Sequence, residues 1–269
     1  MSVHRNGALL VAALVLGVAT LSAQETIYQR FAPVDLTGTW VSVVTEDWQF
    51  RMITPAKGDF ANLSINAEAE KVALAWDPAK DEAAGLACQS YGAPTIMREP
   101  GRVRIAWASG NALRVEIDSG QQTRLFNFAG ATPPAGRAGW QGFSQASWEY
   151  VGGFDPLTVG AEPPNAAGRR GGGRGGSGRG AAPRAPGGAL KVVTNRLRAG
   201  YLRKNGVPFS EDATVTEYFN VHTDEGITWL VVTTIVHDPK YLRTEYITSS
   251  NFKKESDDSK WQPRPCTAR

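Results

Sequence analysis

The chain has 269 residues, of which 42% are hydrophobic, 20% charged and 9% aromatic, and its formal net charge is +3. This composition excludes a wholly disordered chain, and the modest charge excludes a dedicated nucleic-acid-binding protein. Residues 161–189, which carry five arginines and one glutamate, account for the positive sign of the net charge. The part of the chain that we expect to fold is therefore slightly acidic.

Residues 1–23 have the pattern of an export signal. His4 and Arg5 precede an apolar run over residues 7–19, and small residues follow as far as Ala23. An uncharged run of about 13 residues is shorter than the roughly 20 that cross a bilayer as a helix. We therefore predict cleavage near Ala23 and a mature protein without a membrane span, located in the periplasm or secreted.

Alternation of apolar and polar residues predicts about ten short strands along the mature chain. The clearest pair is 102–107 and 113–118, joined by a turn at Ser109-Gly110-Asn111. Because no long helices alternate with the strands, the pattern favours an all-β, antiparallel, lipocalin-like barrel of 8–10 strands over a parallel α/β fold. The other strands are expected at 38–45, 48–53, 122–128, 143–150, 190–197, 214–221, 227–236 and 245–253.

Two short helices interrupt the strand pattern. Asn66 can cap the first helix, whose apolar face recurs at i, i+3, i+4 and i+7 from Ala69 to Trp76. Asp77 followed by Pro78 is a second helix start, and Gly85 is typical of a helix end. We expect the first helix to pack on the barrel and the second to lead into Cys88.

The chain contains two cysteines, Cys88 and Cys266. An exported chain passes through an oxidising compartment, where paired thiols tend to form disulfides. We therefore predict a Cys88–Cys266 disulfide, and the alternative is two separate buried thiols.

Residues 161–189 form a low-complexity segment, called here the Gly/Arg-rich loop. It contains ten glycines, four prolines and no large apolar residue, so it cannot bury enough surface to offset the entropy lost on ordering. We expect a disordered loop between two parts of one barrel, residues 24–160 and 190–269.

A series of motifs covers nearly all of the mature chain. Gly38-Thr39-Trp40 opens the first strand, and the later motifs are Cys88, Gly92-Ala93-Pro94, Met97, Trp148-Glu149, Asp238-Pro239 and Cys266. In this order they resemble a large family of exported bacterial proteins of uncharacterised function. The resemblance implies a lipocalin-like barrel with Trp40 closing one end, and it implies no established reaction. Family members usually continue from Trp-Glu into the next strand as a tight hairpin, so the resemblance makes the Gly/Arg-rich loop an insertion in a hairpin turn.

The strand over 227–236 is apolar on both faces, which is typical of a strand covered on both sides. In a barrel of eight or more strands, one of those sides can be a lumen that holds a small ligand. We predict an apolar ligand site, with no cofactor, lined by Trp229, Phe219, Val231, Glu217 and Trp40. Glu217 shares a strand face with Phe219 and would be an inward carboxylate.

Two alternatives remain open. One is an interaction or structural module with a packed barrel, whose loop engages an anionic surface or polysaccharide through Arg169, Arg170, Arg174 and Arg179. This arginine pattern resembles an RNA-binding RGG box, but export argues against nucleic acid.

The other alternative is an enzyme in which His237 acts as a general base beside Asp212 or Asp238, since a turn near residues 223–226 brings these residues together. The same register places His222 roughly 30 Å from His237, which excludes a metal shared by the two imidazoles.

Overall fold

The computed structural model describes residues 27–136, 138–153 and 187–269. The predicted signal peptide and its cleavage point lie outside these residues. So do residues 154–186, which include all the arginines of the Gly/Arg-rich loop.

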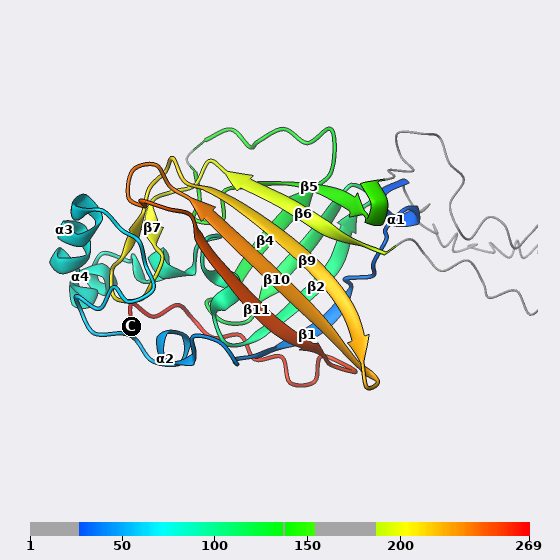
Figure 1. The fold of residues 1–269 in the computed structure, drawn as a ribbon, viewed down its shortest axis with the longest axis horizontal. Helices are drawn as coiled ribbons and strands as arrows, with labels where there is room; N and C mark the ends of the chain where they lie inside the picture. Colours follow the sequence, from blue (N-terminus) through cyan, green and yellow to red (C-terminus); the bar gives the residue numbers. More distant parts are fainter. Residues whose placement is uncertain (1–26, 137, 154–186) are drawn as a thin grey trace, which may run out of the picture.

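Nine strands close into a barrel in the order β1-β11-β10-β9-β6-β5-β4-β3-β2 (Figure 1). This confirms the predicted all-β barrel. The nine strands are β1 Gly38–Val43, β2 Arg102–Ser109, β3 Ala112–Ile117, β4 Gln122–Asn127, β5 Phe143–Tyr150, β6 Gly188–Asn195, β9 Thr214–Asp224, β10 Ile227–His237 and β11 Tyr246–Lys254. The short strands β7 (Gly200–Tyr201) and β8 (Pro208–Phe209) pair outside the barrel.

The barrel is antiparallel except at one place. β4 and β5 pair in parallel, with Phe126 opposite Ser144. A parallel pair needs a connection that returns the chain to the end where it started, and residues 128–142 provide it. β5 and β6 are paired antiparallel up to Tyr150 and Gly188, so residues 151–187 join two strands that pair as a hairpin.

The longest hairpin is formed by β9 and β10. Its turn consists of Glu225 and Gly226, which have φ angles of 49° and 77°. Two consecutive positive φ angles are typical of the two-residue turns whose twist matches that of antiparallel strands. The turn sets a register in which His222 lies opposite Trp229 and His237 lies opposite Thr214.

Both predicted helices are present. α3 (Ala67–Ala75) begins at Asn66, whose side chain accepts a hydrogen bond of 3.0 Å from the amide of Ala69. α4 (Pro78–Ala83) begins at Asp77, which accepts from the amides of Ala79 and Lys80. The remaining helical segments are α1 Ile27–Arg30, α2 Trp48–Arg51, η1 Ala87–Tyr91, η2 Ile96–Arg98 and η3 Val151–Gly153.

The prediction of a strand over 48–53 is wrong, because this segment contains α2. The carbonyl of Asp47 accepts from the amides of Phe50 and Arg51, which closes a helical turn. Arg51 is buried, and its guanidinium binds the carboxylate of Glu46 and the carbonyl of Arg98. These contacts with Arg98, distant in sequence, favour the helical turn over the strand that local alternation suggested.

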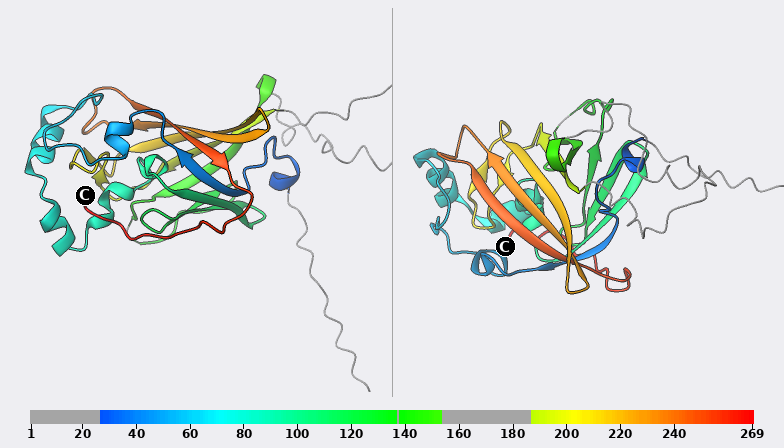
Figure 2. Two further views of the ribbon diagram at one scale, coloured as in Figure 1. Left: turned by 90° about the horizontal axis from the view of Figure 1, so that it is seen from below. Right: turned by 45° about the vertical axis from the view of Figure 1, so that its right-hand side comes forward.

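The two ends of the barrel are covered by different elements. α3 and α4 lie at one end and α1 at the other (Figure 1 and Figure 2). One apolar cluster fills the barrel, and a second, which includes Ala69, Ala73 and Phe209, lies under α3. The predicted disulfide is present between Cys88 in η1 and Cys266, with a Cα–Cα distance of 5.1 Å.

Candidate functional site

The interior of the barrel is filled by its own side chains. The rings of Phe126 and Phe219 meet edge to face, with centroids 5.2 Å apart, although β4 and β9 are not neighbours in the barrel. Trp40 and Glu217 are also fully buried. Three of the predicted site residues, Phe219, Glu217 and Trp40, therefore face the interior, and Phe219 and Glu217 contact other side chains there.

Glu217 forms a buried ion pair across the barrel with Arg124 of β4. Two guanidinium nitrogens of Arg124 bind the two carboxylate oxygens, one at 2.9 Å, and neither side chain is exposed. Arg124 also donates to the hydroxyl of Thr194, which in turn bonds Ser144. The sequence reasoning missed Arg124. This residue lies two positions before Phe126, on the same inward face of the strand, and could have been found from that spacing.

The expectation that Trp229 and Val231 face the interior is wrong. Leu230 and Val232 of β10 are fully buried, whereas Trp229 and Val231 are half-buried on the outer face. Because successive side chains of a strand point to opposite sides, the two outer residues cannot line a lumen together with Phe219. Both faces of this strand are apolar, so its sequence contains no signal for which face is inside.

Among the described residues, no hydrogen bond or ion pair joins His237 to Asp212 or Asp238, its two predicted partners. His237 is exposed at the end of β10, and Asp212 is exposed as well. Asp238 is 1% exposed, and its carboxylate accepts from the amide and the hydroxyl of Ser210, each at 2.7 Å. This contact ties the loop before β9 to the end of β10 and leaves His237 outside it.

A cavity of about 290 Å³ lies at the end of the barrel near α1. Its walls combine side chains of β2, β3 and β5 with the chain segment that precedes β1. The residues around it are Gln29, Ala32, Val34, Asp35, Leu36, Thr37, Trp107, Leu113 and Trp148. We call this space the mouth cavity.

Residues 27–37 form a strap over the mouth cavity. Three aromatic side chains of the barrel donate hydrogen bonds to carbonyls of the strap: Trp148 to Tyr28 (2.8 Å), Tyr150 to Phe31 (2.9 Å) and Trp40 to Leu36 (3.0 Å). The ring of Tyr28 also stacks on Phe128, with centroids 4.9 Å apart. The barrel therefore holds the strap by polar atoms of side chains whose apolar parts belong to the core.

The apolar wall of the mouth cavity is largely aromatic. The rings of Trp107 and Phe128 are 5.6 Å apart and those of Phe128 and Trp148 are 5.4 Å apart. The two tryptophans that border the cavity are thus held in place through Phe128. The sequence reasoning did not predict a ligand site at Trp107 and Trp148, because the strap that turns this end of the barrel into a cavity is placed by long-range contacts.

No family model, curated protein or solved structure matches the chain. None of the helices within residues 27–136, 138–153 and 187–269 has the length and apolar character needed to cross a bilayer. Within the same residues, no three His, Cys, Asp or Glu side chains lie together in a way that could hold a metal ion. The fold therefore defines a mostly antiparallel closed β-barrel, and its chemistry has to be argued from its own cavities.

Proposed function

We propose that the protein is an exported, lipocalin-like barrel that binds a small, largely apolar ligand in the mouth cavity. The observation that carries this proposal is the cavity itself, which Trp107, Leu113 and Trp148 line beneath the strap. The resemblance of the sequence motifs to an exported barrel family supports the same class.

The size of the mouth cavity restricts the ligand. Ligand pockets usually measure about 300–1,000 Å³, so a volume of about 290 Å³ accommodates only a compact molecule. The tryptophan faces favour a flat or aromatic ligand. Asp35 is the acidic residue on the rim, and its carboxylate already accepts from the amide and hydroxyl of Thr37. A neutral ligand is therefore favoured over an anionic one.

Two features support export. Residues 1–23 have the pattern of a cleaved signal peptide. The disulfide between Cys88 and Cys266 is of the kind that persists in oxidising compartments such as the periplasm.

The test is a fluorescence titration of the mature protein with indole, geraniol and octanoate. We expect a saturable change in tryptophan emission at micromolar concentration for indole or geraniol, and a weaker response to octanoate. Trp107→Ala removes one wall and should weaken binding about tenfold or more, since burying a large apolar side chain contributes about 1.5–3 kcal/mol.

Trp229→Phe is the matched control, because Trp229 lies on the outer face of β10. This variant should bind the probes as the native protein does. Failure of all three probes to bind, or an equal effect of the two tryptophan variants, would contradict a ligand site at the mouth.

The filled interior favours a second candidate, an interaction module in which the Gly/Arg-rich loop engages an anionic surface. In that case no probe binds. The intact mature protein should instead co-sediment with vesicles containing phosphatidylglycerol, and a variant lacking residues 161–187 should not. The four arginines invoked here, Arg169, Arg170, Arg174 and Arg179, lie outside the described residues.

A further inference from the structure

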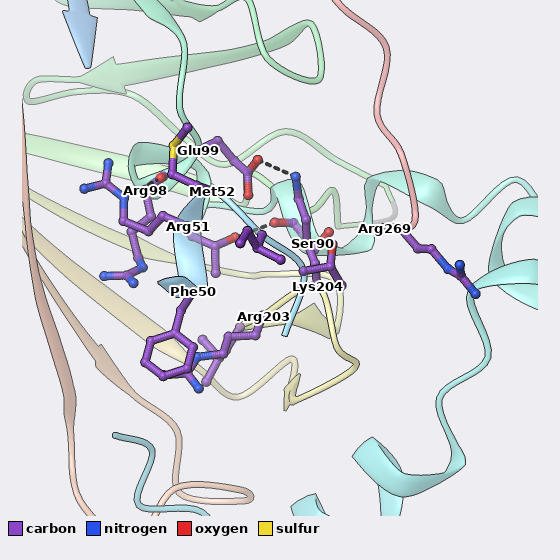
Figure 3. A pocket seen from close by; sticks show the side chains of 13 residues that line it. Phe50, Arg51, Met52, Ser90, Arg98, Glu99, Arg203, Lys204 and Arg269 are labelled. Atoms are coloured by element: carbon purple, nitrogen blue, oxygen red, sulfur yellow. Dashed lines mark hydrogen bonds and ion pairs between the residues drawn. The ribbon is translucent and has the colours of Figure 1, made fainter. Parts of the chain in front are cut away.

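A second cavity, of about 130 Å³, is lined by a group of cationic side chains (Figure 3). It lies between α2, η1, η2 and residues 202–204, outside the barrel interior. Arg51, Arg98, Arg203, Lys204 and Arg269 all line it. We call this space the α2 cleft.

Three arginines of the α2 cleft are buried to an unusual degree. Arg51, Arg98 and Arg203 are 7%, 6% and 5% exposed. Five of their guanidinium nitrogens are buried without a hydrogen-bond partner: Nη2 of Arg51, Nη1 of Arg98, and Nε, Nη1 and Nη2 of Arg203. Buried donors normally have a partner, so this group has a capacity for binding that the chain itself does not use.

The charges of the cleft are only partly compensated. Three of these five cations have a carboxylate partner: Arg51 with Glu46 (2.9 Å), Arg98 with Asp47 (3.3 Å) and Lys204 with Glu99 (2.7 Å). Arg203 forms no ion pair with any carboxylate of the described residues. Its guanidinium lies on the ring of Phe50, 4.2 Å from the ring centroid, as Figure 3 shows, and the hydroxyl of Tyr246 is its polar neighbour within the chain.

The three guanidinium groups also act on one another. Burial lowers the pKa of both Arg51 and Arg203, and the charge of Arg98 lowers each of them further. An arginine stays protonated at any ordinary pH, so the electrostatic repulsion between these guanidinium groups is not relieved by the loss of a proton. A bound anion would relieve it.

We propose that the α2 cleft binds one compact oxyanion, a phosphate or carboxylate group carried by a small molecule, between Arg51, Arg98 and Arg203. Guanidinium groups bind both kinds of oxyanion through paired N–H donors, and the unpaired nitrogens supply such donors from three side chains. These nitrogens have almost no exposed surface and Phe50 lies over Arg203, so binding of the anion requires the side chains around the cleft to move. Met52 and Ile53 are exposed beside the cleft and offer an apolar surface to the rest of the ligand.

The test uses the mature protein and two probes, sodium phosphate and sodium acetate, against sodium chloride at equal ionic strength. Calorimetric titration should find one phosphate site per chain. Phosphate at saturating concentration should raise the melting temperature by about 2 to 4 °C more than chloride does. A comparable rise with acetate identifies the shared oxyanion chemistry, and a rise with phosphate alone identifies a phosphate group.

Arg203→Met removes the unpaired charge and keeps an apolar side chain of similar length. We expect this variant to fold, to melt no lower than the native protein in chloride, and to lose the phosphate-dependent rise. Arg243→Met is the matched control, because Arg243 is an exposed arginine outside the cleft and its loss should leave the rise unchanged.

Arg203→Lys serves as a second variant if the methionine variant does not fold, since it keeps the charge without the forked donors. It should bind phosphate at least tenfold more weakly than the native protein. The proposal is overturned if phosphate and acetate act no differently from chloride, or if the folded Arg203 variants bind phosphate as the native protein does. Neither result bears on the mouth cavity, which contains none of these residues.

Discussion

Replacing Glu217 with Gln tests whether the ion pair across the barrel is sealed from water. The substitution keeps the size of the side chain and removes its charge. Arg124 would then be left in a site with no exposed surface, facing an amide whose nitrogen cannot accept its hydrogen bonds. Breaking one partner of a buried pair costs about 3–5 kcal/mol. For a domain of this size that corresponds to a fall of roughly 6 to 20 °C in melting temperature.

The assay is urea unfolding followed by tryptophan fluorescence, with Glu149→Gln as the control. Glu149 pairs with Lys191 at 3.4 Å on the outside of the same barrel, and both side chains are about one-third exposed or more. Because exposed ion pairs contribute little, the control should lose no more than about 0.5 kcal/mol. The double variant Arg124→Met, Glu217→Leu removes both charges and should be about as stable as the native protein or more stable.

The outcome that refutes this reasoning is a cost below about 1 kcal/mol for Glu217→Gln, or one equal to that of the control. Either result would mean that water reaches the pair and that the barrel interior is more open than its packing indicates. An open interior would return the ligand site to the lumen.

Three further predictions concern the disulfide, the loop and the α2 cleft. Thiol labelling of the denatured, unreduced protein should find no free thiol, and Cys266→Ser should cost about 2–5 kcal/mol with the circular dichroism of the strands unchanged; two titratable thiols in the untreated protein would disprove the bridge. Replacing residues 154–186 with an Asn-Gly turn should change the free energy of unfolding by at most about 2 kcal/mol, because β5 and β6 are already paired up to Tyr150 and Gly188; a larger loss would show that the replaced residues contribute to folding. Burial raises the pKa of Glu99 and Lys204 opposes this shift, so Lys204→Met should raise the pKa of Glu99 further above its unfolded value. The contribution of Glu99 to stability is then greatest below the unfolded pKa and is lost as the pH rises. The urea midpoints of the variant at pH 5 and pH 8 should therefore differ by more than those of the native protein.

Much of the fold was predictable from the sequence, because its signals are local. Side chains alternate every second residue along a strand, and this period alone placed β5 at Phe143–Tyr150 with both bounds correct. The helix caps at Asn66 and Asp77 were equally readable, since a cap depends on residues within one turn. The disulfide followed from the cysteine count and the predicted compartment.

The tertiary structure alone decided which face of a strand points into the barrel and which residues distant in sequence contact each other. β10 is apolar on both faces, so only the closure of the barrel determined that Leu230 is inside and Trp229 outside. Residues 48–51 form the helix α2 and not the expected strand, because Arg51 binds both the nearby carboxylate of Glu46 and the carbonyl of Arg98, far along the chain. The mouth cavity and the α2 cleft were not predictable for the same reason: each is assembled from segments that only folding brings together, and their chemistry follows from burial that no local pattern encodes.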